Sequence, residues 1–251
     1  MKVSIIISAY HAADFITTCL DSCINQHLPD GWDMEIIVGV DGCPDTLQVA
    51  CKIKNPTVTI LEMDQNYGTY ITANTMIQYA SGNIISRVDA DDTLHPNRLY
   101  QCITHMMEHP EIGMINTFYE DYSADFTDLI KSQQEAADGV WIFRREVLDK
   151  AGGYMSWRCG ADSELLSRLR AWKIPEHVIK EPLYMRRCHK QSLTTQGETR
   201  NGSPLRAKYR EIILSDRARY AAGEEPQPII PAMGVIKSIF HKGEIVHESS
   251  D

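Results

Sequence analysis

The chain has 251 residues, 43% of them hydrophobic, and it carries a formal net charge of -9 at pH 7. This length allows one large domain with a sizeable core, or one domain with a small appendage. The lysines and arginines form no long basic run. Non-specific binding to a nucleic-acid backbone is therefore disfavoured.

The seven cysteines form no C-x-x-C pair, and their odd number argues against a secreted disulfide framework. A cytoplasmic location fits better.

The apolar run Val3–Ile7 is interrupted by Ser4 and is too short for a signal peptide or a membrane span. We therefore expect a first strand and no transmembrane segment. Cys19 and Cys23 share one helical face, but no partner pair follows, so core packing is favoured over metal binding.

Strand and helix patterns alternate through the first ninety residues. β-Branched apolar runs predict strands, and apolar residues at three- and four-residue spacing predict helices. The predicted elements are a strand over 3–8, a helix over 15–24, a strand over 35–41, a helix over 46–53, a strand over 58–63, a helix over 71–80 and a strand over 84–89. This order predicts an α/β fold with a largely parallel central sheet and helices on both faces.

The second half is less regular. The predicted elements there are a helix from Pro96 to before Pro110, a strand over 112–119, a loop or short helices over 123–139, a helix over 162–172, and short strands over 178–180 and 183–187. A charged helix from Pro204, a proline-rich break over 226–231 and an apolar patch over 235–240 complete the chain.

Aspartates close two of the predicted strands. Asp41 follows the second strand, and the run from Asp89 to Asp92 closes the fourth. Ligands of open α/β sheets bind outside the carboxyl ends of the strands, so these side chains lie where a ligand would bind. Clustered carboxylates repel one another unless a cation lies among them, and Mg²⁺ or Mn²⁺ on a diphosphate would relieve that repulsion. An isolated D-x-D motif is more often a solvated turn before a helix, so the motif does not decide alone.

The motif is accompanied by segments that resemble, in order and spacing, the inverting glycosyltransferases of family two, which have the GT-A nucleotide-sugar fold. The segments are residues 3–10, 20–26, 35–42, 66–68, 81–85, and 89–92 with 95–99. A weaker likeness covers 143–145 with 152–154, 161–165, and 187–189 with Ser192 and Thr194. Residues beyond Pro204 have no counterpart.

The resemblance implies roles for single residues. Donor-binding positions are Ser8, Ala9, Tyr10, Asp41, Asp89 and Asp91. Among them, Tyr10 and Asp41 would hold the base, and Asp89 would lie near the ribose or donor sugar. Asp91 would coordinate Mn²⁺ or Mg²⁺ on the diphosphate, and His189 would complete the metal shell, although a structural histidine is an equal alternative.

Asp162 corresponds to the catalytic base of the family. Ala161 stands where the family usually has a second acidic residue, so the assignment depends on Asp162, on Glu164 and on the leucines behind them. The alternative role of Asp162 is a helix cap. For Asp41, a position at the end of a strand predicts a carboxylate that faces solvent.

The resemblance thus predicts a metal-dependent inverting glycosyltransferase, a hexosyl- or N-acetylhexosaminyltransferase. It would move a sugar from a nucleoside-diphosphate sugar, UDP-linked, to the hydroxyl of an unidentified acceptor. The predicted domain is 1–200, with a nucleotide-sugar-binding half over 1–99 and an acceptor-side half over 100–200. Residues 201–251 would form a helical extension.

Three other functions fit the sequence less well. A nucleotidyltransferase needs a glycine-rich loop after the first strand, and a dinucleotide-dependent oxidoreductase needs G-x-G-x-x-G there, but residues 8–13 contain no glycine. A non-catalytic nucleotide- or carbohydrate-binding module on a degenerate GT-A fold would keep the sheet without a complete set of acid-base and metal residues. Retention of Asp89, Asp91, Asp162 and His189 argues against such a module.

Overall fold

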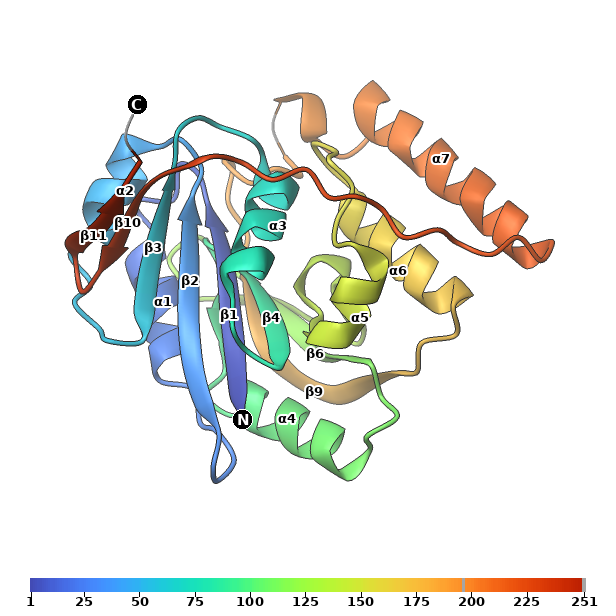
Figure 1. Cartoon of the computed structure of the whole chain (residues 1–251), viewed down its shortest axis with the longest axis horizontal. Coiled ribbons are helices and arrows are strands. Elements are labelled where there is room, and N and C mark those ends of the chain that lie inside the picture. The colour runs from blue at the N-terminus through green and yellow to red at the C-terminus, as the bar shows by residue number, and fades with distance from the viewer. Residues whose placement is uncertain (196, 250–251) are drawn as a thin grey trace.

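The structure, a computed structural model, describes residues 1–195 and 197–249 (Figure 1). The strands are β1 (Lys2–Ala9), β2 (Asp33–Val40), β3 (Val58–Met63), β4 (Ile84–Asp89), β5 (Thr93–Leu94), β6 (Met114–Tyr122), β7 (Leu129–Gln133), β8 (Ile142–Arg144), β9 (Glu176–Arg187), β10 (Ile236–His241) and β11 (Glu244–Glu248). The helices are α1 (Ile16–Ile24), α2 (Pro44–Ala50), α3 (Thr69–Tyr79), α4 (Arg98–Glu108), α5 (Arg145–Ala151), α6 (Ala161–Ala171) and α7 (Pro204–Ala221), with 3-10 turns η1 (Asp138–Val140) and η2 (Gly197–Thr199).

The strands form one sheet in the order β11-β10-β3-β2-β1-β4-β8-β6-β9-β5, with β7 paired to β6. β3, β2, β1 and β4 are parallel neighbours, as the alternating sequence pattern predicted. Beyond them the sheet is mixed: β8 runs antiparallel to both β4 and β6, whereas β6 and β9 are parallel. The carboxyl ends of β1, β2 and β4 consequently meet at one edge.

The alternation of side chains along the strands divides the core into two layers, one on each face of the sheet. Val3, Ile5 and Ile7 of β1 face the layer covered by α1, α2 and α4. Ile6 and, on β2, Ile37 face the layer covered by α3, α5 and α6. Figure 1 shows α3, α5 and α6 on the viewer's side of the sheet. The predicted α/β class with helices on both faces is confirmed.

The second half differs from the sequence-based expectation at β7 and β9, and β8 and α5 lie where no element was expected. β7 lies in the stretch expected to be a loop or short helices, and pairs antiparallel with β6. It is exposed over most of its length, so no buried face marked it in the sequence. β9 is one strand where two were expected; its pairing with β6 shifts register close to Pro182, which has no N–H for the ladder.

The C-terminal part contains both a helix and strands. α7 begins after Ser203, whose hydroxyl accepts a hydrogen bond from the N–H of Arg206 at 3.2 Å. The chain then runs back across the helical layer (Figure 1), where Ile229 N–H donates to the Ala151 carbonyl at 3.1 Å. β10 finally pairs antiparallel with β3, and β11 pairs with β10. The expected helical extension is therefore helical only over α7, and the apolar patch 235–240 joins the main sheet.

Among the described residues, no helix combines the length and apolar character needed to cross a membrane.

Candidate functional site

The candidate site lies at the sheet edge where β1, β2 and β4 end. Ser8 pairs with Gly39 of β2 and with Asp89 of β4, and Ala9 pairs with Val40. The structure therefore brings the expected donor-binding residues of three strands together. Ala9 is buried, and the Ser8 hydroxyl donates to the carbonyl of Thr69 at 2.9 Å, which joins β1 to the start of α3.

Tyr10 follows β1 and is 48% exposed, although it is a large aromatic residue. Its ring packs on one side against His11, with 4.1 Å between the ring centroids. His11 has a positive φ of 51°, a conformation that turns the chain sharply after the strand. This geometry leaves an accessible aromatic surface at the sheet edge, as stacking on a nucleotide base requires.

Asp41 is only 2% exposed, so the expectation that its carboxylate faces solvent is wrong. One oxygen accepts hydrogen bonds from Tyr67 N–H at 2.8 Å and from the Thr72 hydroxyl at 2.9 Å, and the other accepts from Gly68 N–H at 2.8 Å. At Gly42, an added Cβ would lie 2.5 Å from the backbone of Asn66, so only glycine fits beside this loop. Asp41 thus fixes the loop 66–68 beside the donor edge, the sheet edge where β1, β2 and β4 end. Contact between Asp41 and a nucleotide base stays a prediction.

Replacing Asp41 with Ala should lower the free energy of unfolding by about 1–3 kcal/mol, because the partly buried N–H groups of Tyr67 and Gly68 and the buried Thr72 hydroxyl lose their acceptor. Nucleotide affinity should fall as well, since the loop beside the site is released. Urea unfolding and calorimetry with UDP on the same folded preparation measure both effects. Unchanged stability would contradict the structural role of the carboxylate.

Arg87 is a buried cation on β4 that belongs to none of the motifs described above. Its guanidinium donates to Asp89 Oδ1 at 2.8 Å and to the Gly139 carbonyl at 2.7 Å. It also lies over the rings of Tyr70 and Tyr154, with 5.4 and 5.9 Å to their centroids. Arg87 therefore holds the Asp89 carboxylate and the loop before β8 in one arrangement. An arginine within a strand expected to be buried was the signal in the sequence.

Asp91 and His189 meet despite their separation of 98 positions in the chain, with 2.8 Å between Asp91 Oδ2 and His189 Nε2. The imidazole also packs against Phe15, 4.6 Å between centroids. Ligand atoms around an octahedral ion with bonds of about 2.1 Å lie about 3 Å apart, so this pair has the spacing of two neighbouring metal ligands. A carboxylate and an imidazole are also suitable donors for Mn²⁺.

Asp92 explains how these two residues are brought together. Its buried carboxylate accepts hydrogen bonds from the Tyr184 hydroxyl at 2.7 Å and from Arg187 N–H at 2.8 Å, both on β9. Burial, followed by the nearby charge of Asp91, raises the pKa of Asp92 well above its ordinary value. The turn after β4 is thereby fastened to the strand that leads to His189.

Asp162 lies in the first turn of α6, and its Oδ1 accepts a hydrogen bond from Ser163 N–H at 2.8 Å. A Cβ added to Gly139 would lie 3.2 Å from Asp162 Oδ2 and 3.9 Å from Asp89 Oδ2. The carboxylates of Asp162 and Asp89 therefore approach the same point beside Gly139. The structure thus brings Asp162, the expected catalytic base, to the donor edge.

The alternative role of Asp162 as a helix cap is not what the structure shows. The residue before the helix is Gly160, in the left-handed region, and α6 has no side-chain cap. Instead, Asp162 lies close to the hydroxyl of Tyr70. Burial, together with the negative charge of Asp162, raises the pKa of Tyr70 well above its ordinary value, so the hydroxyl keeps its proton.

Glu164, the other acidic residue of this turn, has a different environment. It is 3% exposed and pairs with Arg168 through two hydrogen bonds of 2.6 and 3.0 Å. Arg168 donates further to the carbonyls of Ala151 and Gly153 at 2.5 and 2.8 Å. Burial raises the pKa of Glu164 in spite of this partner. Glu164 orients Arg168, which bonds α6 to the end of α5, and is therefore not free to take a proton from a substrate.

Comparison with protein families identifies the chain. The profile described as Glycosyl transferase family 2 matches residues 4–155, and the chain belongs to this family. The match includes Asp41, Asp89 and Asp91, whereas Asp162 and His189 lie beyond it. The assignment made from the sequence segments is confirmed at the level of the family.

Two curated proteins show how far the sequence similarity extends. The chain is 32% identical over 126 residues to a chondroitin synthase of Pasteurella multocida strain Pm70, covering 49% of this chain and 13% of that protein. It is 33% identical over 103 residues to the succinoglycan biosynthesis protein ExoO of Rhizobium meliloti, covering 40% and 28%. The chain thus spans less than a third of the length of either relative.

Solved structures share the fold. TarS 1–349 of S. aureus in complex with UDP-GlcNAc aligns with a TM-score of 0.71 at 17% identity, over 90% of this chain and 68% of that one. The mannosyltransferase PcManGT of Pyrobaculum calidifontis, in complex with GDP-Man and Mn²⁺, aligns with a TM-score of 0.61 at 19% identity, over 90% and 65%. These likenesses concern the fold, and the predicted GT-A fold is confirmed.

Proposed function

We propose that this chain is a metal-dependent inverting glycosyltransferase that moves a sugar from a nucleoside-diphosphate sugar to an acceptor hydroxyl. The observation that carries the proposal is the convergence of the Asp91–His189 pair, Asp89 and Asp162 on the carboxyl edge of a GT-A sheet. Asp91 and His189 can hold a cation, and Asp162 can take a proton. Membership of glycosyl transferase family 2 supports the same reaction class.

The donor site in this proposal combines a stacking surface with a fixed loop. Tyr10 offers its exposed ring to the base, and Asp41 orders the loop 66–68 beside it. Ser8 and Ala9, at the end of β1, would line the bottom of the donor site, and Asp89 would lie next to the ribose or donor sugar. We propose a UDP-linked donor, which the likeness to TarS in complex with UDP-GlcNAc supports.

Asp91 and His189 would hold Mg²⁺ or Mn²⁺ through Oδ2 and Nε2. The ion would supply Lewis-acid stabilisation of the negative charge on the departing nucleoside diphosphate. Arg87 keeps Asp89 in place from the buried side, so the carboxylate does not turn away from the donor. These residues bind and orient the donor.

Asp162 would act on the acceptor. In the proposed reaction its carboxylate accepts the proton of the acceptor hydroxyl while that oxygen bonds to the anomeric carbon. The bond from the anomeric carbon to the diphosphate oxygen breaks on the opposite face, and its electron pair leaves with the nucleoside diphosphate. A single displacement inverts the configuration, so no covalent intermediate with the protein is needed.

The test is a screen of nucleotide-sugars for hydrolysis and transfer in the presence of Mn²⁺. We expect UDP-sugars to be turned over, and EDTA to abolish the reaction. The matched control is Asp162→Asn, which separates turnover by this protein from turnover by a contaminant. Binding of UDP without turnover of any donor would contradict the proposal and favour a non-catalytic binding module.

A further inference from the structure

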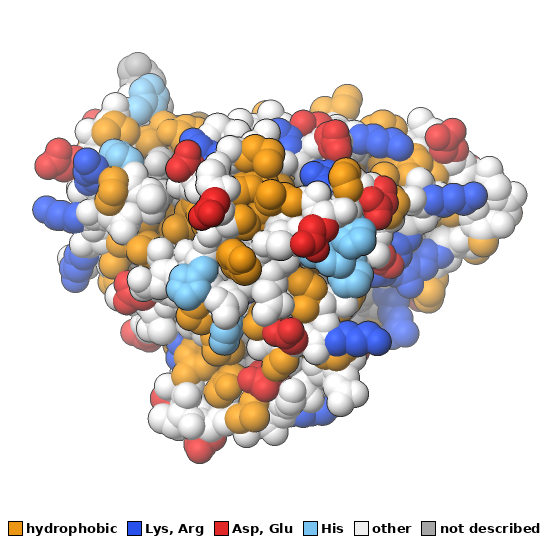
Figure 2. All heavy atoms as spheres, turned by 90° about the horizontal axis from the view of Figure 1, so that it is seen from below, with side chains coloured by type: hydrophobic (Ala, Val, Ile, Leu, Met, Phe, Trp, Pro, Cys, Tyr) orange, Lys and Arg blue, Asp and Glu red, His pale blue; other side chains and the backbone are white. Residues whose placement is uncertain are grey.

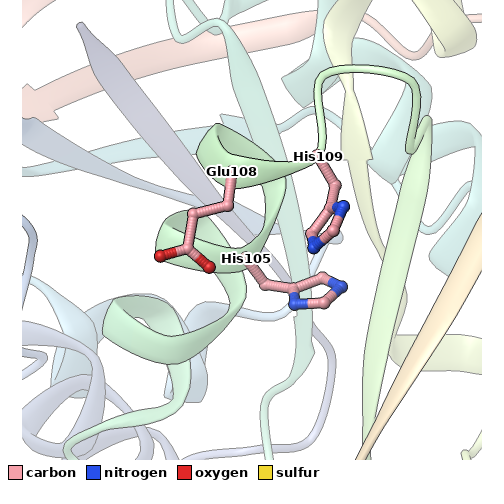
Figure 3. A group of neighbouring side chains, drawn as sticks. All are labelled: His105, Glu108 and His109. Atoms are coloured by element: carbon pink, nitrogen blue, oxygen red, sulfur yellow. The ribbon is translucent and has the colours of Figure 1, made fainter.

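The C-terminal end of α4 carries a cluster of histidine and carboxylate side chains that plays no part in the proposed reaction. Figure 3 shows the imidazoles of His105 and His109 beside one another at the end of the helix, with Glu108 on the same turn. His105 also stacks on His177 at the start of β9, 3.9 Å between centroids. His189 follows the other end of β9, and twelve strand residues at about 3.3 Å each place it roughly 30 Å or more away.

The ligand atoms of this cluster are close enough to share an ion. One atom each from His105, Glu108 and His109 lies within 4.8 Å of the others. Among residues 1–195 and 197–249, this is the only group of three or more His, Cys, Asp or Glu side chains with that property. Ligand atoms around a tetrahedral Zn²⁺ lie about 3.3 Å apart, so rotations of the exposed side chains can close the remaining gap.

The spacing follows from helix geometry. Residues three and four positions apart lie on one face of a helix, so the sequence His105-Met-Met-Glu108-His109 presents its two imidazoles and its carboxylate together. Met106 of the same turn is buried in the core, which fixes the helix beneath the cluster. Glu111 reinforces the negative charge, with Oε1 3.5 Å from His109 Nδ1.

We propose that His105, Glu108 and His109 form a second metal site, for Zn²⁺. Imidazole nitrogen and carboxylate oxygen are ligands that Zn²⁺ prefers, and three protein ligands leave one position for water. A shallow hollow lined by Tyr100, Thr104 and Ile179 opens beside His105 and Glu108 and gives this water room. The ion would fasten the last turn of α4 and so raise the melting temperature.

The experiment is calorimetry with ZnCl₂ on the full chain carrying Cys188→Ser and Asp91→Ala. These two changes remove the exposed thiol and the metal ligand proposed for the donor site. We expect about one Zn²⁺ per chain. Loss of a group that only orients a metal ligand lowers affinity about 10- to 100-fold, so His109→Ala, which removes a ligand itself, should lower Zn²⁺ affinity at least tenfold.

His109 is exposed, so its replacement should leave the fold intact, which far-ultraviolet circular dichroism verifies. His247→Ala, an exposed histidine on β11, is the matched control and should leave Zn²⁺ affinity unchanged. Zn²⁺ should also raise the melting temperature of the background chain and not of its His109→Ala variant. No Zn²⁺ binding by the background chain, or equal binding with His109→Ala, would overturn the proposal.

Discussion

Replacing Asp162 with Asn is expected to lower sugar transfer by about a hundredfold or more, while UDP affinity stays close to that of the wild type. The amide keeps the shape of the side chain but cannot accept the proton of the acceptor hydroxyl. Asp162 is not the helix cap, so the cost in stability should be about 1 kcal/mol or less, from the helix dipole. Transfer rate, UDP affinity and urea unfolding are measured on one preparation.

Asp149→Asn is a suitable control, because it makes the same chemical change at an exposed position of α5. It should leave the transfer rate unchanged. Near wild-type transfer by Asp162→Asn would exclude Asp162 as the base. Glu164 is no replacement candidate, because it is buried and bound to Arg168 by two hydrogen bonds. The binding-module function would then be favoured.

Much of the fold was predictable where local pattern and burial agree. β1 is a mainly apolar run, β4 begins with Ile84 and Ile85 and is buried up to Val88, and α4 buries its apolar residues on one face. In the sequence, β10 is marked only by the apolar patch 235–240. Its partner β3 lies about 175 positions earlier, and Lys237 bonds to Glu62 across the pair, so nothing local indicates the pairing. Strands that depend on a distant partner are poorly marked in their own sequence.

The site residues likewise divide into those that local pattern indicates and those whose role depends on distant parts of the chain. Asp89 and Asp91 could be proposed as site residues from the sequence because they close a strand, and strand ends are set by local pattern. The buried state of Asp41 depends instead on Thr72 and on the backbone of loop 66–68, which fold back on it from elsewhere in the chain. The roles of Asp92 and Arg87 likewise depend on tertiary contacts, which one sequence does not display.

Replacing Asp91 with Ala is expected to abolish the effect of metal on nucleotide binding. In the wild type, Mn²⁺ should strengthen the binding of UDP by at least about tenfold, because the side chains of Asp91 and His189 would hold the ion and the ion would offset the negative charge of the diphosphate. Asp91→Ala removes one of the two proposed protein ligands of the ion. UDP affinity measured by calorimetry should then be nearly equal with Mn²⁺ and with EDTA.

Asp14→Ala provides the matched control. Asp14 is an exposed carboxylate next to Phe15, whose ring packs on His189, so its removal changes the local charge without removing a proposed ligand. If negative charge alone attracted the cation, Asp14→Ala would weaken the Mn²⁺ effect as well. If coordination is responsible, Asp14→Ala keeps the effect, whereas His189→Ala reduces it together with Asp91→Ala. Equal UDP affinity with and without Mn²⁺ in the wild type would refute metal-dependent donor binding, because the Asp91–His189 pair would then be a simple hydrogen bond between the turn after β4 and the segment after β9.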